Sequence, residues 1–129
     1  MTLRSPLGRV RGLGTAKEGA HHWWLQRITA IALVPLTLLF VALLPVFAAV
    51  GYQGFITLMR DPLIATVMVL VVVTGLWHMK LGVQVIVEDY VQHEGVKTAF
   101  QLVLTLGTAA LGAACLVSIL MLALSSAPR

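Results

Sequence analysis

A histidine lies in the middle of an apolar stretch of this chain. His78 falls within residues 63–87, where the only other polar side chains are two threonines, a lysine and a glutamine. An ionisable side chain inside a bilayer costs about 2.5–3.5 kcal/mol on insertion scales, so such a residue marks a candidate functional site. An imidazole can ligate haem iron or carry protons. A histidine that only packs against neighbouring helices is the alternative, and the residues alone leave all three open.

The residues that follow His78 form one face of a helix. At about 100° per residue, His78, Gly82, Val85 and Asp89 fall on the same side. Gly82 lies one turn from the histidine, and its missing side chain leaves space for a flat ligand such as a porphyrin edge. Lys80 lies about 200° from His78, so we expect it to extend toward the membrane surface, with a propionate contact as the alternative.

The end of this helix and the start of the first apolar stretch supply three more candidates. Tyr90 follows Asp89, about 18 Å along the helix from His78 at a rise of 1.5 Å per residue. A phenol can donate a hydrogen bond to a quinone carbonyl, and a carboxylate or a water that it holds can supply a proton. Arg27 can form charge-assisted bonds with a haem propionate or in a quinone pocket. Simple placement at the membrane surface is the alternative for both Tyr90 and Arg27.

Composition indicates an integral membrane protein. The 129 residues are 59% hydrophobic and 11% charged, against roughly 45–50% and 25% in soluble domains. No charged residue occurs between Arg27 and Arg60 or between Lys97 and Arg129, and each gap exceeds the roughly 20 residues that span a bilayer. We expect an all-α fold with transmembrane helices at residues 28–50, 63–87 and 98–124, a basic segment at 1–27 and a short tail at 125–129.

The distribution of charge predicts the orientation. Basic residues flank the apolar stretches mainly on the side of the N-terminus, where we expect Arg4, Arg9, Arg11, Lys17, Arg27 and Lys97. Such a bias places that side in the cytoplasm. We therefore interpret the net charge of +4 as a signal for membrane orientation and for contact with anionic lipid headgroups. We expect no nucleic-acid partner. Pro6 and the neighbouring glycines argue against a mitochondrial presequence, so the segment is expected to be retained.

Two motifs resemble one known family. Residues 78–91, HMKLGVQVIVEDYV, resemble the H-x3-G-x-Q-V-x3-D-Y-V motif of the hydrophobic D-type membrane anchor subunit of succinate dehydrogenase (succinate:quinone oxidoreductase, respiratory complex II). Residues 26–33, QRITAIAL, are similar to the arginine-x-Thr-Ala motif at the start of that family's first helix. The length, the three spans and the topology also agree with that family. The third helix is similar only in its apolar character and carries no matching motif.

The resemblance implies a role in a larger complex of the tricarboxylic acid cycle and the respiratory chain. The chain would pair with a second, C-type anchor subunit and hold the flavoprotein and iron–sulfur subunits at the cytoplasmic face of a bacterial inner membrane. His78 would be one axial ligand of haem b, and the C-type subunit would supply the other. Tyr90 would donate a hydrogen bond to ubiquinone, Asp89 would lie in the proton pathway, and Arg27 would lie near the haem propionates and the quinone.

The chain has no flavin or dinucleotide motif and a single cysteine, Cys115. Together with these absences, the resemblance implies a subunit of an oxidoreductase that binds no succinate itself and receives electrons from its partners. A fumarate reductase anchor is one alternative, because the sequence does not set the direction of the reaction. A small membrane protein without redox function, in which His78 only packs, is another, and the mitochondrial inner membrane is the alternative location.

Overall fold

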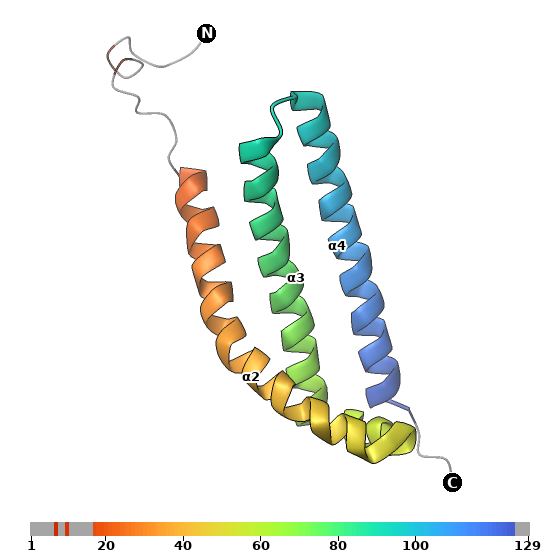
Figure 1. Ribbon diagram of the computed structural model, residues 1–129. Helices are drawn as coiled ribbons and strands as arrows, with labels where there is room; N and C mark the ends of the chain where they lie inside the picture. The colour runs from red at the N-terminus through yellow and green to blue at the C-terminus, as the bar shows by residue number, and fades with distance from the viewer. Residues whose placement is uncertain (1–6, 8–9, 11–16, 126–129) are drawn as a thin grey trace.

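The computed structural model describes Leu7, Val10 and residues 17–125. Helix α2 (Lys17–Met59), helix α3 (Pro62–Tyr90) and helix α4 (Glu94–Ala123) follow one another (Figure 1). All three are long and apolar enough to cross a membrane. The predicted all-α fold with three transmembrane helices is confirmed. The arginines at positions 4, 9 and 11 and the last four residues of the predicted tail lie outside the described residues.

The helices extend beyond the predicted spans. Helix α2 begins at Lys17, although the first span was expected from residue 28, and α3 continues to Tyr90 rather than residue 87. A gap between charged residues marks only the part of a helix that can lie in lipid. The helix itself continues until its backbone is interrupted or capped. The structure defines where each helix begins and ends, whereas the part of each helix that lies in the membrane stays a prediction.

Helix α2 is bent and then broken near its end. Pro35 and Pro45 lie inside it, and Gly51 has φ 65° and ψ −175°, a region that is essentially restricted to glycine. The rings of Phe47 and Phe55 meet edge to face across this break, with centroids 5.2 Å apart. Beyond the break, the end of α2 runs across the base of the bundle (Figure 1).

The connection from α2 to α3 is capped and tied to the end of α4. Asp61 caps α3, because its Oδ1 accepts hydrogen bonds from the backbone N–H groups of Leu63 at 2.8 Å and Ile64 at 3.2 Å. Pro62 takes the first helical position, where its missing N–H costs nothing. Arg60 donates from Nε and Nη2 to Oγ of Ser125, both at 3.3 Å. The chain therefore joins its three helices at this end.

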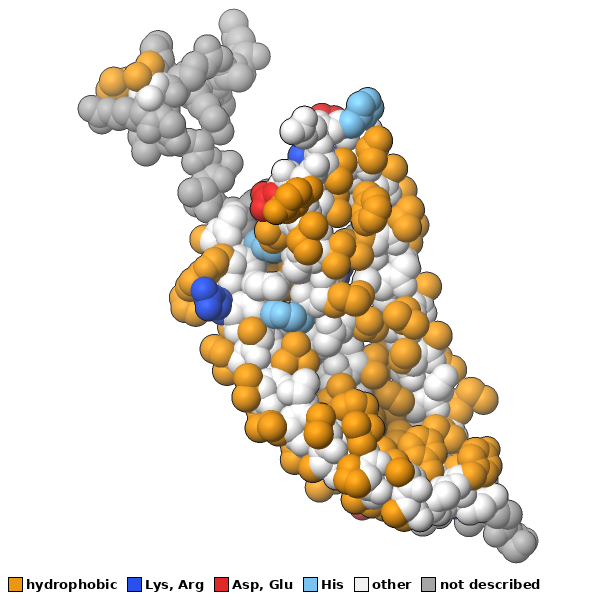
Figure 2. All heavy atoms as spheres, in the orientation of Figure 1, with side chains coloured by type: hydrophobic (Ala, Val, Ile, Leu, Met, Phe, Trp, Pro, Cys, Tyr) orange, Lys and Arg blue, Asp and Glu red, His pale blue; other side chains and the backbone are white. Residues whose placement is uncertain are grey.

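Helix α3 is the central element. It packs against both α2 and α4, which scarcely touch each other. Only Met59, Met68, Leu81 and Val87 are buried among the described hydrophobic residues, so most apolar side chains face outward. Figure 2 shows a largely hydrophobic surface, with most charged and histidine side chains toward the end that carries the N-terminus. Such a surface suits a bilayer and helices from other subunits.

Candidate functional site

His78 lies half-buried on the side of α3 that faces α2. Its Nδ1 is 2.9 Å from Oγ1 of Thr29 on α2. The same oxygen lies 2.8 Å from the carbonyl oxygen of Leu25 and 3.1 Å from that of Gln26. Within the described part of the chain, Nε2 of His78 makes no hydrogen bond. One ring nitrogen is thus held by α2, and the other is available to a ligand or metal.

Two contacts set the alignment of α2 with α3. Thr29 meets His78, and a Cβ added at Gly82 would lie 3.6 Å from Nε2 of Gln26. The positions of three residues agree with the predicted shared face: His78 contacts α2, Gly82 lies beside Gln26 of α2, and Val85 lines the cavity next to α2. Asp89, the fourth residue of that face, is exposed. The amide of Gln26 lies beside Gly82 in this chain, and the expectation that Gly82 leaves space for a flat ligand stays a prediction.

Arg27 lies closer in depth to His78 than to Tyr90. The antiparallel alignment places Arg27 opposite the part of α3 around Lys80, and Tyr90 lies ten residues further on, about 15 Å along the axis. Arg27 lies below the first turns of the bundle, because α2 begins ten residues before it, at Lys17. The exposed guanidinium stacks over the ring of Trp23, 5.3 Å from its centroid, a cation–π contact.

Tyr90 and Asp89 form the exposed end of α3. Tyr90 is 82% exposed, Asp89 is also exposed, and neither makes a side-chain hydrogen bond within the described residues. The chain does not bring them together with His78, which lies about 18 Å further down the helix. A ligand that bridges Tyr90 and Arg27 would need further walls from another subunit.

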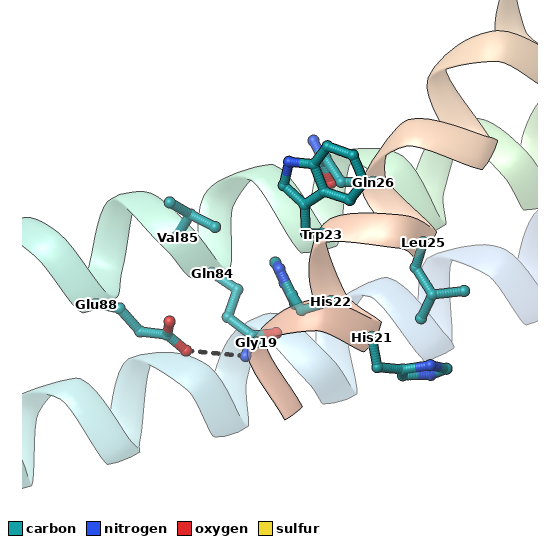
Figure 3. Close-up of a pocket in the computed structure, with 9 residues that line it drawn as sticks. All are labelled: Gly19, His21, His22, Trp23, Leu25, Gln26, Gln84, Val85 and Glu88. Atoms are coloured by element: carbon teal, nitrogen blue, oxygen red, sulfur yellow. Dashed lines mark hydrogen bonds between the residues drawn. The ribbon is translucent and has the colours of Figure 1, made fainter. Parts of the chain in front are cut away.

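A cavity of about 940 Å³ lies between the start of α2 and the last turns of α3 (Figure 3). Its depth falls between Tyr90 and His78. His22 points toward Gln84 and Glu88 in Figure 3, whereas the ring of His21 is turned away from these two residues. Nε2 of His22 and Oε1 of Gln26 are buried and have no hydrogen-bond partner among the residues that the structure describes. The lining residues are Gly19, His21, His22, Trp23, Leu25, Gln26, Gln84, Val85 and Glu88.

A small polar cluster forms one wall of this cavity. Oε1 of Glu88 accepts hydrogen bonds from the amide of Gln84 at 2.9 Å and from that of Gln101 on α4 at 3.2 Å. Sequence reasoning missed His22, Gln26, Gln84 and Glu88 as site residues. For Gln84 and Glu88 the available signal was their position beside Val85 on α3. Gln26 and His22 lie near the start of α2, which was not recognised as helical.

Lys80 lies on the other side of α3. It lines an open groove of about 390 Å³ between α3 and α4, together with Trp77, Thr105 and Thr108. Its predicted absence from the face of His78 is confirmed. In the described part of the chain no three histidine, cysteine, aspartate or glutamate side chains gather as a metal site.

Comparisons with known proteins identify the family. The model of the succinate dehydrogenase/fumarate reductase transmembrane subunit family matches residues 1–124, almost the whole chain. The chain belongs to this family. Its resemblance through the second-helix and first-helix motifs is thereby confirmed.

Curated relatives agree with the family model. The succinate dehydrogenase hydrophobic membrane anchor subunit of Rickettsia bellii is 38% identical over 91 residues, covering 69% of this chain and 71% of the relative. The protein of the same name from Paracoccus denitrificans is 29% identical over 114 residues, 88% of each chain. The succinate dehydrogenase membrane anchor subunit of Reclinomonas americana is 36% identical over 83 residues, 60% of this chain and 68% of the relative. No solved structure matches.

These findings confirm the coarse function predicted from the sequence. This member of the succinate dehydrogenase/fumarate reductase transmembrane family is a multi-pass membrane protein and a membrane anchor subunit of succinate dehydrogenase. It therefore belongs to an oxidoreductase complex and associates with catalytic subunits.

Proposed function

We propose that this anchor subunit supplies one axial ligand of haem b and part of the site where ubiquinone is reduced with electrons from succinate. The observation that carries the proposal is the environment of His78. Its Nδ1 is engaged by Thr29 at 2.9 Å, and its Nε2 makes no hydrogen bond in the described part of the chain. A ligating histidine commonly has its other ring nitrogen hydrogen-bonded in this way.

The donor set fits a haem shared between two subunits. His78 is the only histidine of this chain within the apolar part of a helix, because the other three lie near the helix ends. A C-type anchor subunit would supply the other haem ligand. Haem b, when bound, would supply a one-electron carrier inside the membrane. Arg27 lies near the depth of His78 and would bind a propionate, since an arginine forms strong charge-assisted bonds with carboxylates.

The end of α3 provides the groups for the quinone. The phenol of Tyr90 would donate a hydrogen bond to a quinone carbonyl and orient the headgroup. The carboxylate of Asp89, or a water that it holds, would deliver the proton that reduction requires. Both side chains are exposed in the isolated chain, which leaves them accessible to a quinone enclosed by a partner subunit.

The cavity beside α2 adds a further proton-handling group. Glu88 lies one turn from Gln84 and holds amide hydrogen bonds from α3 and α4. The unpaired polar atoms of His22 and Gln26 face the same region. Buried polar atoms usually bind water when protein partners are missing. We assign to this cavity a chain of waters that connects the N-terminal end of the bundle with Asp89 and the quinone.

The arrangement of the ends suggests how the complex is held. The start of α2 and the loop between α3 and α4 lie at the same end of the bundle, which the basic residues assign to the cytoplasm. The flavoprotein and iron–sulfur subunits would dock there, at a bacterial inner membrane. The names of the relatives refer to succinate dehydrogenase, which favours succinate oxidation over the fumarate reductase alternative.

Haem content tests the proposal directly. The intact complex is purified through a tag on this chain, as wild type, His78→Ala and His93→Ala, and reduced-minus-oxidised spectra are normalised to flavin. His93 is an exposed control at the start of α4, without a side-chain hydrogen bond at the cap. We expect a b-type signal in wild type and His93→Ala and its loss in His78→Ala. A haem-free wild-type complex, or full haem in His78→Ala, would contradict the assignment.

A further inference from the structure

We infer that Thr29 is a positioning residue for His78, because its hydroxyl accepts the Nδ1–H proton and thereby leaves the lone pair on Nε2. The inference rests on the proposed function of His78 and adds to it the tautomer and the residue that sets it. Neither ring nitrogen of a neutral histidine is a fixed donor. The other neighbours of the Thr29 hydroxyl therefore decide which partner donates in the Thr29–His78 hydrogen bond.

A count of protons gives that direction. Oγ1 of Thr29 has three close neighbours: the carbonyl oxygens of Leu25 at 2.8 Å and Gln26 at 3.1 Å, and Nδ1 of His78 at 2.9 Å. A hydroxyl has one proton to donate and two lone pairs, and a carbonyl can only accept. If the proton went to Nδ1, both carbonyl oxygens would face lone pairs of Oγ1. Donation to Leu25, with Nδ1–H of His78 as donor to Oγ1, gives the hydroxyl proton an acceptor at 2.8 Å and gives Nδ1–H an acceptor at 2.9 Å.

Other threonines of the bundle show where a hydroxyl proton goes by default. Oγ1 of Thr37 lies 2.6 Å from the carbonyl oxygen of Leu33 and 3.1 Å from that of Val34. Thr66 and Thr108 also donate to the carbonyl four residues earlier, at 2.6 and 2.7 Å. This bond is a common way for a helical threonine to satisfy its hydroxyl. Thr29 repeats the pattern and uses its remaining lone pair for His78.

Three consequences follow for the ligand. The imidazole ring is fixed by a bond to a neighbouring helix, so its plane cannot rotate freely. The Nδ1–H bond also increases the electron-donating strength of Nε2, an effect typical of hydrogen bonds to ligating histidines. Finally, the bond couples α2 to the haem ligand on α3, so displacement of α2 changes the ligand itself. A threonine that only packed between helices would produce none of these effects.

Thr29→Val tests the inference, because valine keeps the shape and removes the acceptor. The controls are Thr29→Ser, which restores a hydroxyl, and Thr37→Val, which removes a threonine of the same helix with no histidine contact. Each intact complex is analysed for haem per flavin, haem affinity, midpoint potential and the electron paramagnetic resonance of ferric haem. Loss of a hydrogen bond to a ligating histidine weakens metal affinity about 10–100-fold. For a neutral hydroxyl we expect about tenfold.

The midpoint potential of the haem is expected to rise in Thr29→Val. A weaker donor stabilises ferric iron less, so the midpoint potential of Thr29→Val should rise, and a tenfold loss confined to the ferric form corresponds to about 59 mV for one electron. Thr29→Ser should return affinity, potential and resonance to wild-type values, and Thr37→Val should leave them unchanged. Unchanged properties in Thr29→Val, or equal changes in Thr37→Val, would overturn the inference while the proposed function stood. Full haem in His78→Ala would overturn both.

If too little Thr29→Val complex assembles, Thr29→Ala and Thr29→Ser give the same comparison without a branched apolar side chain. Restoration by serine alone supports the hydrogen bond. Equal haem affinity and potential in the alanine and serine forms would overturn it, because the two differ in the hydroxyl that the inference requires.

Discussion

Gly82 tests how closely α2 must approach α3. A Cβ at this position would lie 3.6 Å from Nε2 of Gln26, an ordinary van der Waals distance, so Gly82→Ala should be tolerated. The longer side chain of Gly82→Leu has to occupy the volume of the Gln26 amide, and this separates Thr29 from His78 one turn away. Insertion of extra carbon atoms into a packed interface costs about 1–3 kcal/mol.

That cost converts into a measurable change. At about 1.36 kcal/mol per tenfold, the closed arrangement of α2 and α3 becomes about 5-fold to about 160-fold less favourable in Gly82→Leu. We expect haem to dissociate more readily from this complex than from Gly82→Ala, measured as haem per flavin during incubation with a haem-scavenging protein. Gly107→Leu is the control, because its Cβ would meet nothing within 4 Å. Equal haem loss in Gly82→Leu and Gly82→Ala would refute the reasoning.

Three further predictions concern other parts of the chain. Tyr90→Phe removes the proposed donor at an exposed position, so quinone reduction should fall while succinate oxidation with an artificial acceptor stays intact; unchanged quinone turnover would remove Tyr90 from the site. Arg27→Gln should alter the haem potential more than the KM for quinone, because Arg27 lies near the depth of His78; the reverse order would place it in the quinone pocket. Gly51→Ala forces a side chain into a glycine-only conformation at a cost of about 1–3 kcal/mol, so the thermal midpoint of the complex should fall below that of Gly107→Ala.

The number and nature of the helices could be predicted from the sequence. Each transmembrane helix contains a long interval without charge, apart from Lys80 in α3, and Asp61-Pro62 is a recognisable helix start. The face of α3 around His78 also followed from helical periodicity. These features depend on residues near one another in the chain, for which the geometry of a helix is sufficient.

Contacts between helices could not be predicted. The pairing of Thr29 with His78 joins residues 49 positions apart, and it depends on the start of α2 and on its alignment with α3. The polar residues before Arg27 gave no hydrophobic period, so the helical start of α2 was missed. The cavity lined by His22, Gln26 and Glu88 was missed for the same reason, because it exists only where that start lies against α3.

The break at Gly51 also sets the vertical position of α2. A straight helix can slide along its own axis in a bilayer, because one apolar turn replaces another at little cost. The segment after Gly51 instead crosses the base of the bundle and buries Met59 there. Sliding α2 along its axis would move this segment away from the base of the bundle and expose Met59. The depth of Arg27 is therefore controlled from the opposite side of the membrane, 24 residues and about 36 Å of helix away.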